Sequence, residues 1–147
     1  MDKCNGLFYG QSNKIWLGLV WQILEVFIIN RMEPKEEANY KLIAKAIEQK
    51  NTICFTYDSH KGKTVKKKAC NVEPYLISKH KSTQNIMLSG YFLPTTEQLW
   101  ERELPEWKFY LLKHISDIVI LNIPFIKPRT KYNPKPFMMD VILAIQL

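Results

Sequence analysis

The hydrophobic and polar positions between residues 72 and 120 follow a pattern typical of β-strands. Three short apolar runs, at 75–77, 86–93 and 109–112, are separated by polar segments rich in Lys, Ser, Thr and Glu. Each run has the length of a strand, and none continues long enough to make a convincing helix. The pattern therefore predicts a β-sheet as the centre of this chain.

The segment before this centre predicts a strand and a very basic return strand. Residues 52–57 (TICFTY) alternate β-branched and aromatic side chains, as in a strand with two different faces. Residues 58–62 (DSHKG) are a turn signal, and residues 63–72 (KTVKKKACNV) are expected to return as a second strand. We expect Pro74 to end that ladder, so that residues 75–78 form a separate strand.

The segment after the centre predicts further strands and an irregular tail. Strands are expected at 107–112 and 115–121, after a polar connection over 94–105. Four prolines among residues 124–136 predict an extended, irregular segment. The last apolar piece, 137–147, suits either a helix or a strand.

Residues 34–50 predict an amphipathic helix. Pro34 suits the first turn, and Glu36 and Glu37 complement the positive end of the helix dipole. One apolar stripe is spaced for a helix and is expected to dock on the sheet: Leu42, Ile43, Ala46 and Ile47.

The first 31 residues differ from the rest of the chain. A polar, loop-like stretch over 1–14 precedes an apolar run over 15–29, which Gln22 and Glu25 interrupt. A helix of that length spans about 22 Å at a rise of 1.5 Å per residue. A hydrocarbon core needs about 30 Å, so a membrane-spanning role is disfavoured.

Three interpretations of this segment stay open. It is a helix packed on the domain or on a partner, a weak membrane anchor, or a leader outside the natural product, which would then start at Met32. We therefore divide the chain into an apolar N-terminal segment, 1–31, and one domain, 32–147. The fold class is mainly β (α+β), with a leading helix and an extra apolar N-terminal helix.

The net charge of +7 lies mostly on the predicted domain. Residues 1–31 supply +1 and the remaining +6 lies on 32–147. This excess favours an acidic partner such as a nucleic acid, a nucleotide or an anionic surface. The alternative is that the charge only keeps a basic protein soluble and monomeric, and that the lysines of residues 61–68 protect an edge strand.

Three widely spaced cysteines, Cys4, Cys54 and Cys70, argue against a disulfide framework and for a reducing, cytoplasmic location. Cys54 and Cys70 could approach each other across paired strands, either as buried thiols or as a redox pair.

The sequence carries no strong catalytic motif. A phosphate-binding glycine loop, GxSxG and HExxH are all missing, and the histidines at 60, 80 and 114 are scattered. His114 and Asp117 could be read as part of a catalytic triad, but a histidine that ends a strand is more often a surface residue. We therefore predict a non-enzymatic protein without a metal or cofactor.

The order of these elements resembles the WYL domain family. The resemblance covers about residues 38–136 and is diffuse, since the order of several short motifs carries it. The matching segments are 72–75 (VEPY), 88–91 (LSGY), 107–118 (WKFYLLKHISDI) and 128–134 (PRTKYNP). The resemblance implies a leading helix on a small, strongly bent Sm/SH3-like β-barrel. It also implies a bacterial regulatory module that senses a ligand or binds nucleic acid, in transcription regulation or defence.

The chain departs from the family pattern at two places. The tripeptide that names the family falls at residues 86–88, which are Ile, Met and Leu. Two family arginines, implicated in binding an acidic ligand or nucleic acid, align with Leu111 and His114. Lys108 and Lys113 stand nearby as substitutes, although a lysine is not a bidentate fork.

The binding hypothesis draws on cations and aromatic rings together. Small barrels bind single strands with cations on the backbone and aromatic rings against the bases. Core positions for the tyrosines are the alternative. The candidate site residues are Lys66, Lys68, Tyr75, Lys79, Tyr91, Lys108, Tyr110, Lys113 and His114.

The sequence thus predicts recognition of single-stranded RNA or DNA, or of a nucleotide-like anion, on a basic face of the barrel. The alternative function is a protein interaction module, which binds a protein partner or forms a homodimer through the apolar N-terminal segment.

Overall fold

The computed structural model describes residues 9–146, with side-chain surroundings from residue 18 onward. The chain forms two compact units, Met1–Glu33 and Pro34–Leu147, and each is described by itself. Cys4 lies outside the described residues.

The first unit contains the helix α1 (Tyr9–Ile29). The expected helix over 15–29 is confirmed, but α1 begins at Tyr9, inside the stretch expected to be a loop. Residues 9–14 contain no proline, the residue that most strongly opposes a helix, so the helix can extend back past the apolar run. No described helix is long and apolar enough to cross a membrane.

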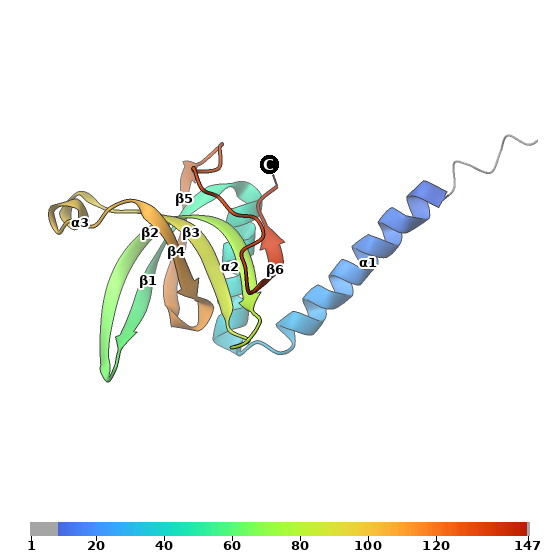
Figure 1. Cartoon of the computed structure of the whole chain (residues 1–147), viewed down its shortest axis with the longest axis horizontal. Coiled ribbons are helices and arrows are strands. Elements are labelled where there is room, and N and C mark those ends of the chain that lie inside the picture. Colours follow the sequence, from blue (N-terminus) through green and yellow to red (C-terminus); the bar gives the residue numbers. More distant parts are fainter. Residues whose placement is uncertain (1–8, 147) are drawn as a thin grey trace, which may run out of the picture. The chain divides into compact units, whose positions relative to one another are not determined.

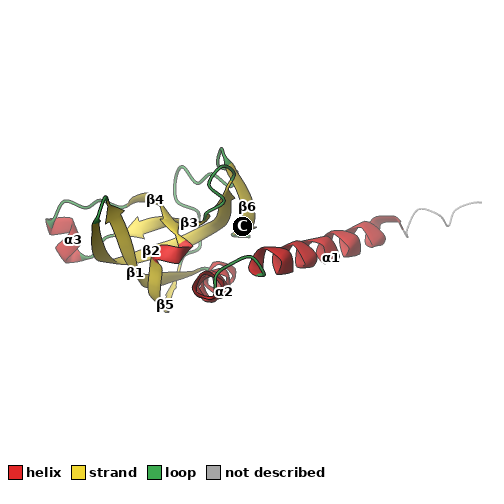
Figure 2. Ribbon diagram, turned by 90° about the horizontal axis from the view of Figure 1, so that it is seen from below, coloured by secondary structure: helices red, strands yellow, loops and turns green. Residues whose placement is uncertain are grey.

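The second unit is a strongly curved, six-stranded antiparallel sheet with helices around it (Figures 1 and 2). Five strands follow the order β4-β3-β2-β1-β5, and β6 pairs with the far end of β2. The expected fold class, mainly β (α+β), is confirmed. In chain order the strands are β1 (Asn51–Lys61), β2 (Thr64–His80), β3 (Ile86–Leu93), β4 (Glu106–Leu111), β5 (Ile115–Pro124) and β6 (Met139–Ala144).

β1 and β2 form a long hairpin that projects beyond the other strands (Figure 1). The turn expected over 58–62 is wrong, since pairing continues to Lys61 opposite Thr64. Asp58 lies opposite Lys67, and such opposite charges stabilise an antiparallel pair. The turn is shortened to residues 62 and 63, where Gly62 adopts a φ of +61°.

Pro74 lies inside β2 and does not end it, which corrects the expected break. It stands opposite Gly90, and the register shifts by one residue directly afterwards. A proline is tolerated at such a bulge because the ladder is already interrupted there. A Cβ on Gly90 would lie 2.3 Å from Val72 Cγ1 and 2.9 Å from the Glu73 carbonyl oxygen. Gly90 therefore lets β3 approach β2 closely at the bend.

The leading helix is confirmed as α2 (Pro34–Gln49), which packs against β1, β2, β5 and the short 3₁₀ helix η1 (Leu112–His114). The amide of Asn39 donates to the carbonyls of Leu112 and Ile115, both at 2.9 Å, and so fixes α2 to the start of β5. Leu42 is 40% exposed and lies outside the docked stripe, contrary to expectation. The buried side chains of α2 are Asn39, Tyr40, Ile43, Ala46 and Ile47.

The connection over 94–105 contains a short helix that we did not expect, α3 (Thr96–Trp100). Thr95 and Gln98 form a capping box. The Gln98 N–H donates to the Thr95 hydroxyl, and the Thr95 N–H donates to the side-chain oxygen of Gln98. This T-x-x-Q spacing is a known signal for a helix start. The irregular segment over 124–136 is confirmed, and the last apolar piece is a strand.

Candidate anion-binding pocket on the core face of the sheet

One face of the β1–β2 hairpin changes from apolar to basic along its length. Directly opposed residues of antiparallel strands point to the same face, and residues two apart along a strand share it. Three opposed pairs follow one another on this face: Phe55 with Cys70, Tyr57 with Lys68, and Ser59 with Lys66. The first pair lies in or beside the core, and the next two extend beyond it. The core face thus continues outward as a basic surface.

β4 brings a second lysine to the same place. Lys108 lies opposite Gly90, on the face that also carries Phe92. The Lys108 and Lys68 ammonium groups lie 4.1 and 4.8 Å from the centroid of the Phe92 ring. Such distances are typical of cation–π contacts. Strands β2, β3 and β4 therefore bring the ammonium groups of Lys68 and Lys108 to the Phe92 ring.

Lys68 and Lys108 also line a pocket of about 250 Å³. It lies where the apolar core of the sheet gives way to the basic part of the hairpin. Its lining includes Tyr57, Ser59, Lys68, Cys70, Lys108 and Tyr110.

Tyr110 contributes a buried hydroxyl group to this pocket. Its ring meets those of Phe55 and Tyr57 edge-on, both with centroids 5.1 Å away. The side chain is 3% exposed, and its hydroxyl has no nitrogen or oxygen hydrogen-bond partner among the described residues. The Cys70 thiol lies beside it and is only a weak hydrogen-bonding partner. An unpaired buried hydroxyl is costly, so this group is a candidate for a ligand contact.

Burial sets the protonation of the polar groups in the pocket. It raises the pKa of the Tyr110 hydroxyl and of the Cys70 thiol, so both stay neutral and keep their protons at neutral pH. Burial, and then the nearby charge of Lys108, lower the pKa of Lys68. Binding an anion would relieve this repulsion between the two lysines.

Two carboxylates balance the charges of these lysines. Glu103 forms an ion pair with Lys68, and Glu106 Oε1 lies 3.1 Å from Lys108 Nζ. All four side chains are at least partly exposed, so the pairs are open to exchange with solvent ions.

The structure divides the nine predicted site residues among different places. Lys66, Lys68, Lys108 and Tyr110 share the face described above. Lys113 lies by the β2–β3 turn, where its Nζ donates to Asn85 Oδ1 at 3.3 Å. Lys79 lies past the Pro74 bend, opposite Ile86 and Asp140. The predicted cations therefore do not form one continuous surface.

The stacking role expected of Tyr75 and Tyr110 needs correction, because both rings are buried. Tyr75 is fully buried, with the rings of Trp107, Phe125 and Tyr132 at 4.9 to 5.2 Å. Its hydroxyl donates to Glu73 Oε2 at 3.1 Å. Neither ring offers an exposed face to a base.

Tyr91 keeps part of its surface exposed, but it lies on the other face of the sheet, opposite Glu73 and Trp107. The guanidinium of Arg129 lies 5.0 Å from the centroid of its ring.

Two of the histidines come together in space, although they are scattered in the sequence. The rings of His60 and His114 lie 4.3 Å apart between centroids. Burial, and then His60, lower the pKa of His114. Among the described residues, no group of three metal-ligating side chains is present.

Sequence reasoning missed Tyr57, Ser59, Cys70 and Phe109 as lining residues of the pocket, and Phe92 as the ring that both lysines contact. The alternation of residues 52–57 carried the signal, because Tyr57 shares a face with Phe55. Which residues of β2 and β3 lie beside that face, however, depends on the register in which the strands pair.

No family model and no curated protein matches the chain. Among solved structures, the chain is similar to Proteasome accessory factor B/C (PafBC) of Arthrobacter aurescens, with a TM-score of 0.48 and 17% identity. The match covers 65% of this chain and 13% of that one.

Proposed function

We propose that this domain binds single-stranded nucleic acid without catalysis and holds a backbone phosphate between Lys68 and Lys108. One observation carries the proposal: both ammonium groups converge on the Phe92 ring, and both lysines line a pocket that Tyr110 lines as well. The Tyr110 hydroxyl has no nitrogen or oxygen hydrogen-bond partner among the described residues. Two cations and a neutral O–H donor form a complementary set for a phosphate.

The size of the pocket favours a polymer over a free nucleotide. Sites that enclose small organic ligands usually measure about 300–1,000 Å³. This pocket, at about 250 Å³, suits a phosphate group better than a whole nucleotide. Positive charge continues along the hairpin through Lys66 and Lys61, on the same face. A row of cations beside a phosphate site is what a nucleic-acid backbone can follow.

Phosphate contacts dominate in this proposal, since the predicted stacking tyrosines are buried. Binding should therefore depend strongly on salt and weakly on base sequence. Such a module suits a regulatory or sensing role in a bacterial cytoplasm, as the family resemblance implies.

The test is the salt dependence of binding by the full chain to labelled single-stranded RNA and DNA. Each phosphate contact contributes a slope of about −0.7 to a plot of log affinity against log salt concentration. We expect Lys68→Ala with Lys108→Ala to reduce this slope by about 1.4, if each lysine contacts one phosphate. Affinity should fall about tenfold or more at physiological salt.

The matched control is Lys45→Ala with Lys135→Ala, which removes the same charge from two exposed positions away from the pocket. Equal effects of both double variants would show that net charge alone attracts nucleic acid, and would overturn the proposed site.

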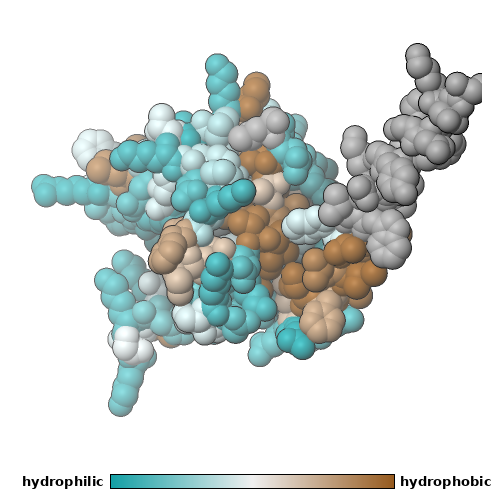
Figure 3. All heavy atoms as spheres, turned by 45° about the vertical axis from the view of Figure 1, so that its right-hand side comes forward, coloured by the Kyte–Doolittle hydropathy of each residue, from teal (hydrophilic) through white to brown (hydrophobic). Residues whose placement is uncertain are grey.

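A second candidate function is self-association or partner binding through α1. Within its own unit, α1 leaves apolar side chains exposed, among them Ile23 at 67%, Trp21 at 56% and Phe27 at 55%. Apolar surface on the described part of this helix is visible in the space-filling view (Figure 3). A helix that is apolar on most sides normally packs against a partner.

This second candidate predicts a concentration-dependent mass for the full chain in light scattering. Ile23→Glu should reduce the mass to that of a single chain. A single-chain mass for the unmodified protein at all concentrations would remove self-association and leave only a different protein partner.

A further inference from the structure

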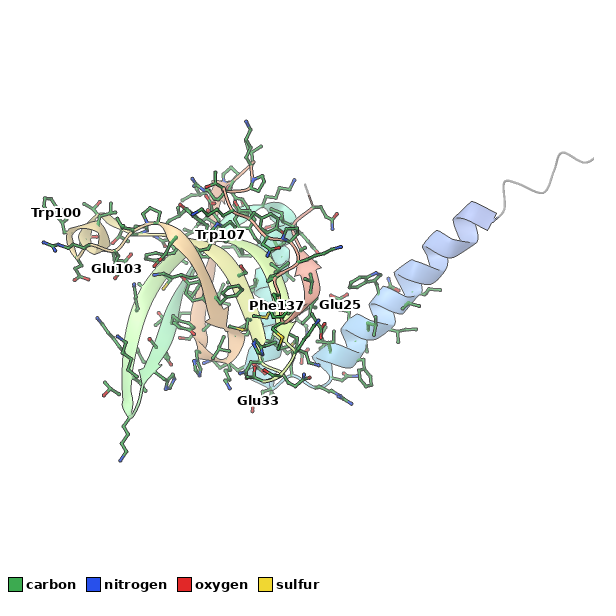
Figure 4. The ribbon with its side chains drawn as sticks, viewed as in Figure 1. Glu25, Glu33, Trp100, Glu103, Trp107 and Phe137 are labelled. Carbon is green, nitrogen blue, oxygen red and sulfur yellow. The ribbon has the colours of Figure 1, made fainter. Side chains whose placement is uncertain are left out.

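The two lysines of the pocket are paired with carboxylates from one short stretch of chain. Residues 96–106, which we call the acidic arm, comprise α3, the loop after it and the first residue of β4. The arm contains four glutamates and one arginine. Figure 4 places Glu103 on this arm together with Trp100.

Three glutamates of the arm act on the phosphate site. Glu103 pairs with Lys68, and Glu106 pairs with Lys108. The charge of Glu101 also favours the charged form of Lys68. Carboxylates thus stand where the proposed ligand would place its phosphate oxygens.

Specific hydrogen bonds hold the arm in this position. Gln98 Nε2 donates to the carbonyl of Ala69, the residue next to Lys68, at 2.8 Å. The N–H of Glu103 donates to the Gln98 carbonyl at 2.9 Å. Arg102 adopts a φ of +64°, a conformation that non-glycine residues seldom take except in sharp turns. The fold of the arm therefore delivers Glu103 to Lys68.

The arm contributes little apolar burial that would resist its release. Its large apolar side chains are exposed, with Trp100 at 84%, Leu104 at 68% and Leu99 at 49%. Polar contacts account for its docking, and a competing anion can replace such contacts. Displacing the loop would uncover little apolar surface.

The geometry points to the acidic arm as an internal competitor, whose Glu103 carboxylate occupies the Lys68 position until a nucleic-acid phosphate displaces it. This inference rests on the proposed function of the same site. A polyanion that engages Lys68 and Lys108 together compensates for both lost pairs. A ligand with one negative charge replaces only one of the two ion pairs. Competition from the arm therefore disfavours the binding of small monoanions more than the binding of polyanions.

The test compares three single variants of the full chain in binding to a labelled single-stranded oligonucleotide. Glu103→Gln removes the competing charge, and we expect affinity to rise about tenfold. Gln98→Ala releases the anchor on Ala69 without changing the net charge, and it should also raise affinity. Glu48→Gln, at an exposed position of α2, makes the same charge change away from the site and should have little effect.

A second measurement follows the arm directly. Amide hydrogen exchange of residues 99–105 in the unmodified chain should accelerate when the oligonucleotide is added, because ligand binding frees the loop. This readout does not depend on how any variant folds. Unchanged or slower exchange in this segment would overturn the displacement.

The outcomes separate this inference from the proposed function. If removing Lys68 and Lys108 weakens binding but neither Glu103→Gln nor Gln98→Ala strengthens it, the arm is not a competitor and the site stands. If Glu103→Gln and Glu48→Gln raise affinity equally, only net charge matters. If removing the lysines has no effect beyond that of the charge control, the proposed function itself is wrong.

Discussion

Arg129 holds the buried carboxylate of Glu73 through two hydrogen bonds, from Nε to Oε2 at 2.9 Å and from Nη2 to Oε1 at 2.7 Å. Glu73 is 4% exposed, whereas nearly half of the Arg129 side chain is accessible. The irregular segment over 124–136 is therefore fixed to β2 by a bidentate ion pair. The Trp107 indole N–H, which donates to the Thr130 carbonyl at 2.8 Å, adds a second attachment.

Arg129→Ala should lower the free energy of unfolding by about 2 kcal/mol, because it leaves a buried carboxylate short of its charged donors. Arg129→Lys should recover only part of this, since an ammonium cannot make both parallel hydrogen bonds. Urea denaturation followed by circular dichroism would measure the change. Lys135→Ala, an exposed charge removal in the same segment, should be nearly neutral; a similar loss in both variants would contradict a specific role of the pair.

Gly90→Ala should destabilise the domain although the backbone φ of Gly90 is not positive. The new methyl would collide with Val72 Cγ1 and with the Glu73 carbonyl, both in a buried part of the bend. Overpacking of this kind typically costs about 1–3 kcal/mol. Thermal unfolding would show the loss. Gly18→Ala, where a Cβ meets nothing within 4 Å, should be neutral or stabilising, and equal stability of both variants would show that the bend yields easily.

The sequence predicted those elements whose signals are local. The stripe of α2 and the alternation in β1 follow from neighbouring residues, so both elements were expected. The bounds of α2 were nearly right, whereas β1 continues to Lys61, past its expected end at residue 57. The break at Pro74 was wrongly expected because its effect depends on the partner strand, where Gly90 allows a bulge. The arm was missed although Thr95 and Gln98 carry a capping signal, because its polar composition resembles a loop.

The pocket could be predicted only in part. The basic strand and the alternation of Tyr57 with Phe55 are visible in the sequence. The meeting of Lys68 and Lys108 over Phe92 depends on β3 lying between β2 and β4 in one register. The burial of Tyr75 was equally hidden, because it depends on Phe125 and Tyr132 returning from the C-terminal segment to cover it.

Mild acid should destabilise the domain through His114. Burial, then His60 and Lys113, lower the pKa of His114 from its usual value of 6.5, while Asp58 opposes them and Lys35 adds a small effect in the same direction as Lys113. The unfolded chain therefore binds this proton more tightly than the folded chain. Just below pH 6.5, the free energy of unfolding should fall as the pH falls.

Denaturation of the unmodified chain and of His114→Gln, each at pH 7.0 and 5.5 in constant salt, would measure this effect. The variant should lose less stability between the two pH values than the unmodified chain. His80→Gln removes a histidine at the end of β2 and serves as the matched control. An undiminished pH dependence in His114→Gln would assign the acid sensitivity to other groups.

Tyr110→Phe separates a structural role of this hydroxyl from a role in binding. The hydroxyl is buried without a hydrogen-bond partner among the described residues, so its removal should leave the free energy of unfolding unchanged or slightly higher. If the hydroxyl donates to a bound phosphate, the variant loses about 1 kcal/mol of binding, which is about fivefold in affinity. Fluorescence anisotropy with a labelled oligonucleotide, combined with urea denaturation, would measure both quantities on the same samples. If both affinity and stability are unchanged, the Tyr110 hydroxyl does not contact the phosphate. The proposed site would then consist of the two lysines. A clear loss of stability would instead mean that the hydroxyl already has a hydrogen-bond partner. Cys70 would then be the residue to substitute next, because its thiol lies beside the hydroxyl.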